Sequence, residues 1–185
     1  MSFNFTHMEI PDVILIEIKN FPDQRGFFEE TFRQSDFSKH GIEMNFSQDN
    51  HSFSRKGVVR GLHFQMAPHE QGKLVYTVCG KIFDVAVDIR PASRTFGKHV
   101  SAELSDENHR MLWIPPGFAH GFMAIEDSHV IYKTTKEYAP GSDSGIIWND
   151  GDIGIRWPAI SPIVSENDLK LRSFAQYREN IRGEK

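Results

Sequence analysis

The chain has 185 residues, of which 39% are hydrophobic and 25% charged, as in a soluble globular protein large enough for one hydrophobic core. A net charge of −4 argues against binding nucleic acid or anionic membranes through general positive charge, and no window approaches the roughly 18 apolar residues of a membrane span. A single cysteine, Cys79, excludes an intrachain disulfide, and the start lacks signal-peptide features, so we expect one cytoplasmic domain over residues 1–185 with no nucleic-acid or membrane partner.

Short strand-like stretches separated by turn signals dominate the chain. The predicted strands cover residues 13–18, 26–33, 45–53, 58–65, 73–78, 82–89, 98–104, 110–114, 121–125 and 128–138. In the stretch 82–89, Val85 and Val87 fall on one face and Asp84 and Asp88 on the other, because strand side chains alternate. Many short strands with little helix favour an all-β barrel or sandwich.

Helix signals are few. One turn is predicted near residues 36–40, and a helix is predicted from about Ser165. The stretch 139–162 is rich in Gly, Pro, Asp and Trp and reads as an ordered loop that covers the β-structure.

The segment Arg60-Gly61-Leu62-His63-Phe64-Gln65 is unusually polar for a buried strand, and Lys73 follows on the next strand. His63 and Gln65 share one strand face. Polar side chains are costly to bury without partners, so a polar ligand or a reaction is the favoured explanation.

His63 can be read as a surface or structural histidine, because the chain has nine histidines. Its neighbours favour a second reading. Arg60 is close in sequence, and the predicted strand 45–53 offers Gln48 and Asn50 on one face. A histidine in such a pocket suits general base catalysis, since its ordinary pKa lies near physiological pH.

A metal site is the main alternative. The spacing Gly57-x5-His63-x-Gln65-x4-Glu70 resembles the first metal motif of the cupins, and Pro115-x-Gly117-x2-His120 resembles the second. Gln65 stands where the motif has its second histidine, and a neutral amide is a poor ligand for metals that favour imidazole. We therefore expect a cupin-type barrel without a metal, while a metal-dependent oxygenase using His63, Glu70 and His120 stays open.

Five further residues allow two readings each. Lys73 is either a strand-edge charge or a group that stabilises negative charge developing on oxygen. Arg25 can simply pair with Asp23 around a turn, and Glu30 can be a solvated strand charge. Tyr132 and Tyr138 share a strand face by parity; buried aromatics are usually core, but tyrosine can donate a proton to a carbanion.

Asp168 also has two readings. Ser165-x-x-Asp168 resembles a helix capping box, although Glu or Gln is preferred at the last position. The alternative is a carboxylate that orients and charge-stabilises a catalytic histidine.

Taken in order and spacing, the motifs of residues 9–174 resemble the dTDP-4-dehydrorhamnose 3,5-epimerase family. The motifs are Phe21-x-Asp23-x-Arg25-Gly26-x-Phe28, Gln48-Asp49-Asn50-His51-Ser52, Arg60-Gly61-Leu62-His63-Phe64-Gln65, Gln71-Gly72-Lys73-Leu74-Val75, Phe83-Asp84-Val85-Ala86-Val87-Asp88-Ile89-Arg90, Thr95-Phe96-Gly97, Leu112-Trp113-Ile114-Pro115-Pro116-Gly117-Phe118-Ala119-His120-Gly121-Phe122, Tyr132-Lys133-x-Thr135 and Trp148-Asn149-Asp150.

The resemblance implies a cupin-type jelly-roll barrel and a homodimer in which an N-terminal strand joins the partner's sheet. It implies an isomerase that needs no metal or other cofactor and acts on a dTDP-4-keto-6-deoxyhexose in dTDP-L-rhamnose biosynthesis. A base removes a proton next to the C4 ketone, an enolate forms, and a proton returns to the opposite face at C3 and then at C5.

Site residues follow from the same resemblance. The implied catalytic residues are His63 as base, Asp168 as its dyad carboxylate, Lys73 at the enolate oxygen and Tyr132 as acid. The implied substrate-binding residues are Arg25, Glu30, Gln48, Asn50, Arg60 and His120, with Tyr138 and Phe21 near the nucleotide base and Asp143 in the following loop.

Two positions depart from the family pattern. Asn167 stands where lysine is common, and Asp143 where glutamate is common, so the nucleotide and sugar preferences are less defined than the reaction type. Epimerisation at C3 or C5 alone, a CDP-linked substrate, and a non-catalytic sugar-nucleotide-binding cupin are the remaining alternatives.

Overall fold

The computed structural model describes residues 2–43, 45–159 and 161–183. Its first sheet has six antiparallel strands in the order β1-β2-β10-β7-β12-β5. These strands are β1 (Phe3–His7), β2 (Ile14–Ile18), β5 (Gln48–Ser54), β7 (Lys73–Cys79), β10 (Arg110–Ile114) and β12 (Ser128–Thr134). Neighbouring strands are mostly far apart in sequence, as expected for a jelly roll.

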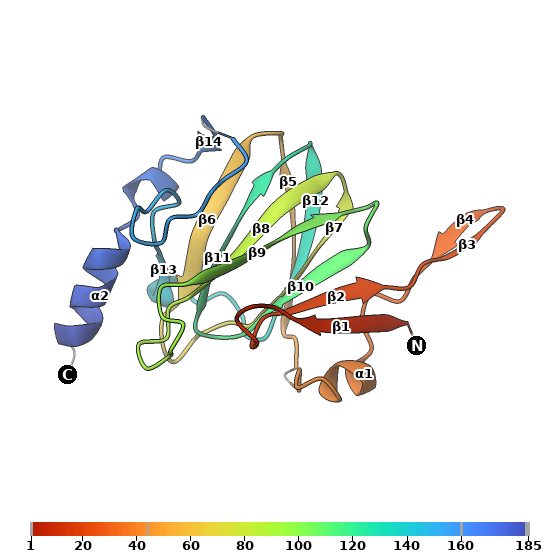
Figure 1. The fold of residues 1–185 in the computed structure, drawn as a ribbon, viewed down its shortest axis with the longest axis horizontal. Coiled ribbons are helices and arrows are strands. Elements are labelled where there is room, and N and C mark those ends of the chain that lie inside the picture. Colours follow the sequence, from red (N-terminus) through yellow and green to blue (C-terminus); the bar gives the residue numbers. More distant parts are fainter. Residues whose placement is uncertain (1, 44, 160, 184–185) are drawn as a thin grey trace.

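The second sheet faces the first (Figure 1) and has the order β13-β6-β11-β8-β9, with β14 pairing parallel to β6. Its strands are β6 (Val58–Gln65), β8 (Lys81–Asp88), β9 (His99–Ser105), β11 (Phe118–Ala124), β13 (Asp143–Gly145) and β14 (Ile163–Val164). The predicted cupin-type β-barrel is thus confirmed.

The space between the sheets holds an apolar core. Val75 and Val130 of the first sheet pack with Ile82, Ala86 and Phe122 of the second, and all five are buried. The alternation predicted along β8 is correct, and it turns Asp84 to the same side of the strand as Ala86. Burying these apolar groups stabilises the barrel, and it leaves the other half of the space between the sheets to polar side chains.

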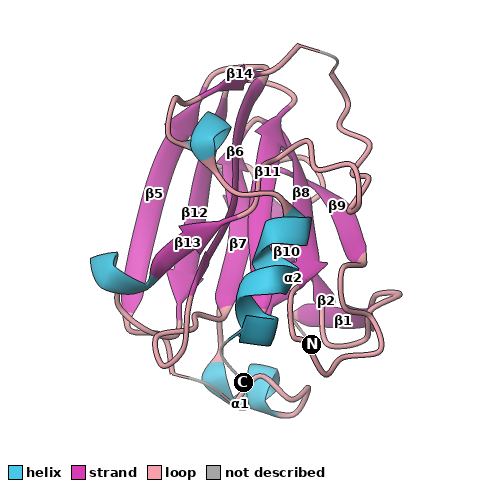
Figure 2. Ribbon diagram, turned by 90° about the vertical axis from the view of Figure 1, so that its left-hand side faces the viewer, coloured by secondary structure: helices cyan, strands magenta, loops and turns pink. Residues whose placement is uncertain are grey.

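Helices cover the outer faces of both sheets. The short helix α1 (Gln34–Ser38) buries Phe37 against Met111 and Trp113 of the first sheet. The helix α2 (Phe174–Gly183) lies across the second sheet (Figure 2), where Phe174 packs with Val87. The predicted turn near residues 36–40 therefore corresponds to α1.

The prediction of a helix from about Ser165 is wrong in its start. A 3₁₀ turn, η2 (Asp168–Lys170), comes first, and α2 begins only at Phe174. Between them the backbone of Arg172 forms a parallel bridge with Ile146, so the chain is extended at this point. Elsewhere the covering loop contains one more 3₁₀ turn, η1 (Pro140–Ser142).

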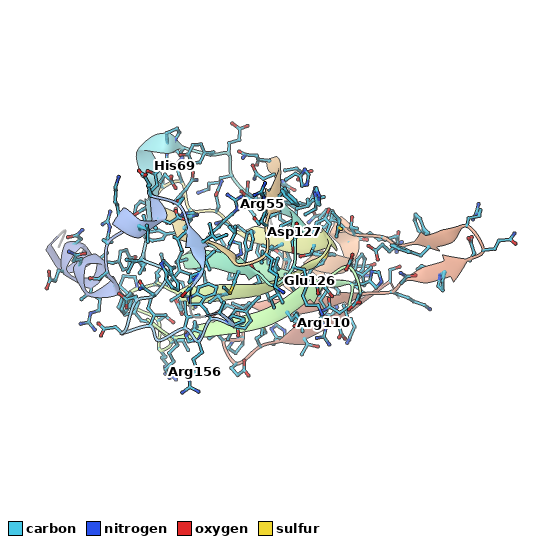
Figure 3. The ribbon with its side chains drawn as sticks, turned by 90° about the horizontal axis from the view of Figure 1, so that it is seen from above. Arg55, His69, Arg110, Glu126, Asp127 and Arg156 are labelled. Carbon is cyan, nitrogen blue, oxygen red and sulfur yellow. The ribbon has the colours of Figure 1, made fainter. Side chains whose placement is uncertain are left out.

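The predicted strand 26–33 begins at the correct residue but is too long, because only residues 26–28 are a strand, which forms a hairpin with an unpredicted strand before it. Strands β3 (Phe21–Asp23) and β4 (Gly26–Phe28) pair around a turn in which Asp23 accepts a hydrogen bond from the Arg25 N–H at 2.7 Å. This hairpin, hereafter the arm, projects from the barrel (Figures 1 and 3). Its Phe27 and Phe28 are 60% and 67% exposed.

Two more strand predictions need correction. Strand β1 was not predicted, although Phe3 and Phe5 alternate with polar residues. The stretch 128–138 is too long, since β12 ends at Thr134, where the threonine hydroxyl donates to the carbonyl of Lys136 at 2.8 Å and the chain turns. Strand parity therefore does not relate Tyr132 to Tyr138.

Candidate active site

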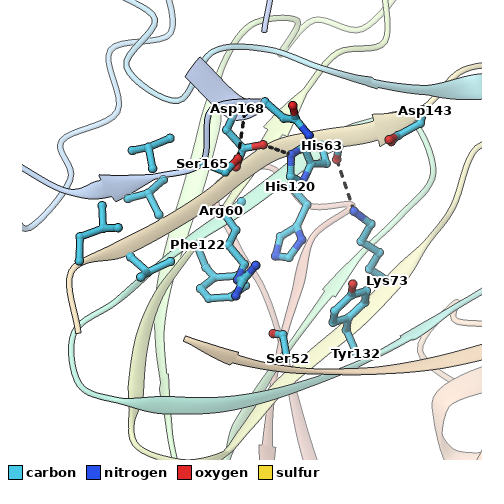
Figure 4. A pocket seen from close by; sticks show the side chains of 16 residues that line it. Ser52, Arg60, His63, Lys73, His120, Phe122, Tyr132, Asp143, Ser165 and Asp168 are labelled. Atoms are coloured by element: carbon cyan, nitrogen blue, oxygen red, sulfur yellow. Dashed lines mark hydrogen bonds and ion pairs between the residues drawn. The ribbon is translucent and has the colours of Figure 1, made fainter. Parts of the chain in front are cut away.

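Two adjoining cavities open on the inner faces of the sheets, with volumes of about 580 Å³ and about 340 Å³. Four predicted site residues line both cavities: His63, Lys73, Tyr132 and Asp143. Arg60, His120 and Asp168 line the larger one, and Gln48, Asn50 and Tyr138 the smaller. The structure thus brings ten of the thirteen predicted site residues to one polar pocket. Figure 4 shows those that line the larger cavity, among them His63, Lys73 and Tyr132.

His63 and Asp168 form a hydrogen-bonded pair at the wall of this pocket. The ring Nε2 lies 2.8 Å from the Asp168 Oδ1, although the residues are far apart in sequence. Asp168 is buried, with a side chain 9% exposed, whereas the His63 side chain is 42% exposed. Because one ring nitrogen binds the carboxylate, the pair fixes the ring orientation and leaves an exposed ring beside the cavity.

The backbone around Gly61 completes this pair. The Gly61 N–H donates to the second carboxylate oxygen of Asp168 at 3.3 Å. Gly61 has φ +116°, and a Cβ there would lie 2.6 Å from the Cα of Gly121, so both positions require glycine for the close approach of β6 and β11. Burial alone raises the pKa of Asp168, but hydrogen bonds from His63, Gly61 and Ser165 outweigh it and lower the pKa below its ordinary value.

The capping interpretation of Asp168 is correct for its backbone only. The Asp168 N–H donates to the Ser165 Oγ at 3.1 Å, as in a capping box. The carboxylate pairs with His63 and accepts the Gly61 N–H, and the Ser165 side chain also helps to lower its pKa. The two readings of Asp168 are therefore compatible.

A second histidine–aspartate pair lies beside the first. His120 is the direct cross-strand partner of His63, and its Nε2 lies 2.7 Å from the Asp84 Oδ1. Both side chains are buried, with exposures of 7% and 0%. Burial lowers the pKa of His120, and the neighbouring Asp84 opposes this effect only in part.

Lys73 is a buried amine rather than a strand-edge charge. Its side chain lies inside the pocket (Figure 4), and its Nζ donates to the His63 carbonyl at 3.3 Å. Burial lowers the pKa of Lys73 to about 8, while the carboxylates of Asp84 and Asp143 oppose that shift. An ammonium with so few neutralising contacts is suited to an anionic ligand atom.

Tyr132 faces this group from the other wall. It belongs to β12 of the first sheet, whereas His63 and His120 belong to the second, and Figure 4 shows it across the cavity. Burial raises the pKa of the Tyr132 hydroxyl, and the positive charge of Arg60 partly offsets this. The hydroxyl therefore keeps its proton at neutral pH.

Arg60 is held at the pocket edge by the neighbouring strand β5. Its Nε donates to the Ser54 Oγ and its Nη2 to the Phe53 carbonyl, both at 2.9 Å. These contacts orient the guanidinium, and among the described residues no carboxylate pairs with it, so its charge is available to a phosphate.

Phe21, Arg25 and Glu30 are not brought to the pocket. Phe21 and Arg25 lie on the arm, where Arg25 pairs with Asp23 at 2.6 Å, as the simpler reading expected. Glu30 follows the arm and is bound by Ser2 at 2.5 Å and by Arg33. Within this chain, none of the three lines either cavity.

The donor set of the metal alternative is not assembled either. Glu70 lies near Lys136, at 3.9 Å, and the Gln65 amide binds the carbonyls of His69 and Glu137. Within residues 2–43, 45–159 and 161–183, no three His, Cys, Asp or Glu side chains are grouped so that they can hold a metal ion.

Sequence reasoning missed Asp84 and Ser52 as site residues. Asp84 is the buried partner of His120, and Ser52 lines the larger cavity with a buried hydroxyl that has no hydrogen-bond partner among the described residues. Both had a signal: Asp84 is a carboxylate inside an apolar strand, and Ser52 shares the face of Gln48 and Asn50 by parity.

Fold and pocket together define a jelly-roll protein of the cupin type with a polar pocket between its sheets. A model of the dTDP-4-dehydrorhamnose 3,5-epimerase family matches residues 7–176. The chain belongs to this family, which confirms the resemblance seen in its motifs. In the part of the chain that the structure describes, no helix has the length and apolar character needed to cross a membrane.

Relatives agree over nearly the full length of the chain. The dTDP-4-dehydrorhamnose 3,5-epimerase of Shigella flexneri is 51% identical over 173 residues, which are 92% of this chain and 96% of the relative. The crystal structure of the Sulfolobus tokodaii enzyme of that name has 52% identity and a TM-score of 0.89, covering 95% of this chain and 97% of the other.

One solved relative also carries a sugar nucleotide. The 3,5-epimerase of Legionella pneumophila, in complex with dTDP-4-keto-L-rhamnose, is 41% identical with a TM-score of 0.90. It covers 95% of this chain, and 96% of it is covered in return.

Proposed function

We propose that this single cupin-like domain inverts C3 and C5 of dTDP-4-keto-6-deoxy-D-glucose in the biosynthesis of dTDP-L-rhamnose, without a metal or other cofactor. The observation that carries the proposal is the placement of a histidine–aspartate pair and a tyrosine on opposite walls of one pocket. An inversion requires this arrangement, because a single group on one face would return the proton to the side it left.

His63 acts as the base in this mechanism. Its exposed ring takes the proton from C3 or C5, which the neighbouring C4 ketone acidifies, and the C–H electron pair moves into an enolate. Asp168 binds the ring Nε2 at 2.8 Å and stabilises the imidazolium that forms. The Asp168 carboxylate is ionised near neutral pH because its pKa lies below its ordinary value.

Lys73 and Tyr132 complete the proton transfer. The Lys73 ammonium stabilises the negative charge on O4 of the enolate, and its burial strengthens that interaction. Tyr132 donates its hydroxyl proton to the opposite face of the carbon, which inverts the centre. Solvent exchange then restores the protonation states of both residues for the second centre.

The remaining pocket residues bind the substrate. Arg60 pairs with the diphosphate, since its guanidinium is oriented but has no carboxylate partner. His120, whose Nε2 is bound to Asp84, accepts a hydrogen bond from a sugar hydroxyl through its other ring nitrogen. In the smaller cavity, Gln48, Asn50 and Asp143 bind the nucleoside, and Tyr138 stacks on its base.

We propose that the protein is a homodimer, which gives the arm residues a place in a pocket. Phe21, Arg25 and Glu30 lie outside their own pocket, on or beside a projecting arm with two exposed phenylalanines. In the dimer they complete the partner's pocket. Mixing Arg25→Ala with His63→Ala subunits should then restore activity above either variant alone, because one mixed site contains both intact residues.

One experiment tests the function as a whole. The protein is incubated with dTDP-4-keto-6-deoxyglucose in deuterated water, and the product is read by NMR. Deuterium at both C3 and C5 with the L-rhamno configuration supports the 3,5-epimerase. Deuterium at one carbon only would identify a monoepimerase, and no deuterium at either would contradict the proposal. The exposed, free Cys79 is compatible with the cytoplasm, where we place this reaction.

A further inference from the structure

Two glutamines from different sheets bind consecutive backbone N–H groups of one loop segment. The segment comprises residues 137–139 and carries Tyr138 at the smaller cavity. Gln48 Oε1 accepts the Tyr138 N–H at 2.8 Å, and Gln65 Oε1 accepts the Ala139 N–H at 2.7 Å. Gln48 lies on β5 of the first sheet and Gln65 on β6 of the second, so the segment is tied to both walls of the barrel.

The Gln65 amide makes three hydrogen bonds to backbone groups around Tyr138. Its Nε2 donates to the carbonyls of His69 at 2.7 Å and Glu137 at 3.3 Å, and the side chain is only 5% exposed. Its oxygen and both its N–H groups are therefore engaged with backbone. Gln65 lines the cavity, but both its N–H donors are used, so it could offer a ligand at most the second lone pair of its oxygen.

The Tyr138 ring needs such support because it lies in the open. It is 54% exposed, and its hydroxyl donates to the Asp143 Oδ2 at 3.1 Å. Asp143 is in turn the cross-strand partner of Gln65. The backbone and the tip of this exposed side chain are thus fixed from two sides, while its ring face stays uncovered.

We propose that Gln65 and Gln48 are positioning residues that preorganise Tyr138 as a stacking platform for the nucleotide base. This inference rests on the proposed function, which supplies the base. A ring ordered before binding loses less conformational entropy when the ligand arrives, so the gain appears in affinity rather than in the proton-transfer step. It also gives Gln65 a role at the position where the cupin metal motif has its second histidine.

The test measures binding of dTDP by calorimetry and, separately, kcat and KM. Gln65→Met keeps the side-chain volume but removes the amide, and we expect it to weaken dTDP affinity about tenfold while kcat changes less than about threefold. Lys136→Ala is the matched control, since Lys136 ties the same segment to the Pro68 carbonyl at 2.6 Å but is exposed. It should change dTDP affinity by less than about twofold.

A double-mutant cycle shows whether the effect passes through the ring. In a Tyr138→Ala background, Gln65→Met should weaken dTDP binding by no more than about twofold, because the platform is already absent. If Gln65→Met does not fold, Gln65→Glu, which keeps the side-chain shape but loses the two N–H donors to His69 and Glu137, takes its place in the same cycle with the same expectation.

Unchanged dTDP affinity in folded Gln65→Met would overturn this inference. So would a double variant whose loss of dTDP affinity equals the product of the losses in Gln65→Met and Tyr138→Ala. Failure of the proposed function would give a different result. In that case the wild-type protein itself shows no hydrogen exchange with the keto sugar, whatever the glutamine variants do to dTDP binding.

Discussion

His63 and His120 are directly opposite each other on strands β6 and β11, and each ring binds its own aspartate. Their exposures differ greatly: the His63 side chain is 42% exposed and that of His120 is 7% exposed. Burial lowers the pKa of His120, so this ring is neutral at physiological pH. Only the His63 ring is accessible to a substrate carbon, which is why we propose His63 as the base and a binding role for His120.

Replacing Asp168 by Asn should separate catalysis from capping. The amide would present an N–H donor to His63 and favour the wrong tautomer, so turnover should fall by about 10²- to 10⁴-fold. Ser165→Ala is the matched variant: it removes the hydroxyl that accepts the Asp168 N–H at 3.1 Å and should cost about 1 kcal/mol of stability. Equal losses of turnover in the two variants would mean that Asp168 is only a structural cap.

Tyr132→Phe removes one hydroxyl from a half-buried side chain and leaves the ring in the core. We expect kcat to fall by about 10²- to 10⁴-fold, with the larger effect on inversion at C5, because the proton donor is lost. Binding of dTDP should change little. Comparing kcat with calorimetric dTDP affinity checks this, and parallel losses of both would make Tyr132 a positioning residue instead.

The buried amine of Lys73 predicts an alkaline limit to activity. Its pKa is lowered to about 8, so the ammonium loses its proton as the pH rises through about 8 and the enolate loses its stabilising charge. The pH profile of kcat/KM should therefore fall above about pH 8. Lys73→Arg stays charged in this range, because guanidinium does not deprotonate in proteins. The alkaline decrease in kcat/KM should therefore shift to higher pH in this variant, even if its rate is lower. An unchanged alkaline decrease in Lys73→Arg would assign the titration to another group.

The strand pattern made much of this site predictable. Strand β6 has the predicted bounds Val58–Gln65, and parity placed Gln48 and Asn50 on the face that lines the smaller cavity. Alternation is a local property, so it can be read from sequence wherever one strand face is buried.

Local patterns do not encode long-range contacts. The pairing of His63 with Asp168 joins residues 105 positions apart, so it was expected from the family resemblance and not from strand alternation. Tyr138 reaches the smaller cavity beyond the end of β12, so the parity argument placed it near Tyr132 for the wrong reason.

A buried carboxylate outside the pocket should set the stability of the barrel in acid. Asp88 accepts hydrogen bonds from Arg90, Ser93 and Thr95. Burial opposes its ionisation, but these bonds lower its pKa to about 2. Its contribution is therefore fully present above the unfolded value of about 3.9 and is lost as the pH falls from about 4 towards 2.

Urea unfolding of Asp88→Asn checks this assignment. The variant should lose about 1–3 kcal/mol of unfolding free energy at pH 7, and the difference from wild type should shrink below about pH 4. Asp12→Asn is the control, because Asp12 binds the same Arg90 at 2.9 Å but is 54% exposed, and it should cost less than about 1 kcal/mol. A pH-independent difference for Asp88→Asn would refute the assignment.

The most direct test of the mechanism is hydrogen exchange by His63→Ala. This variant and the wild type are incubated with dTDP-4-keto-6-deoxyglucose in deuterated water, with His40→Ala as a control whose ring stacks on Phe5. We predict that wild type and His40→Ala place deuterium at C3 and C5, and that His63→Ala places it at neither. Undiminished exchange in folded His63→Ala would contradict the assignment of His63 as the base.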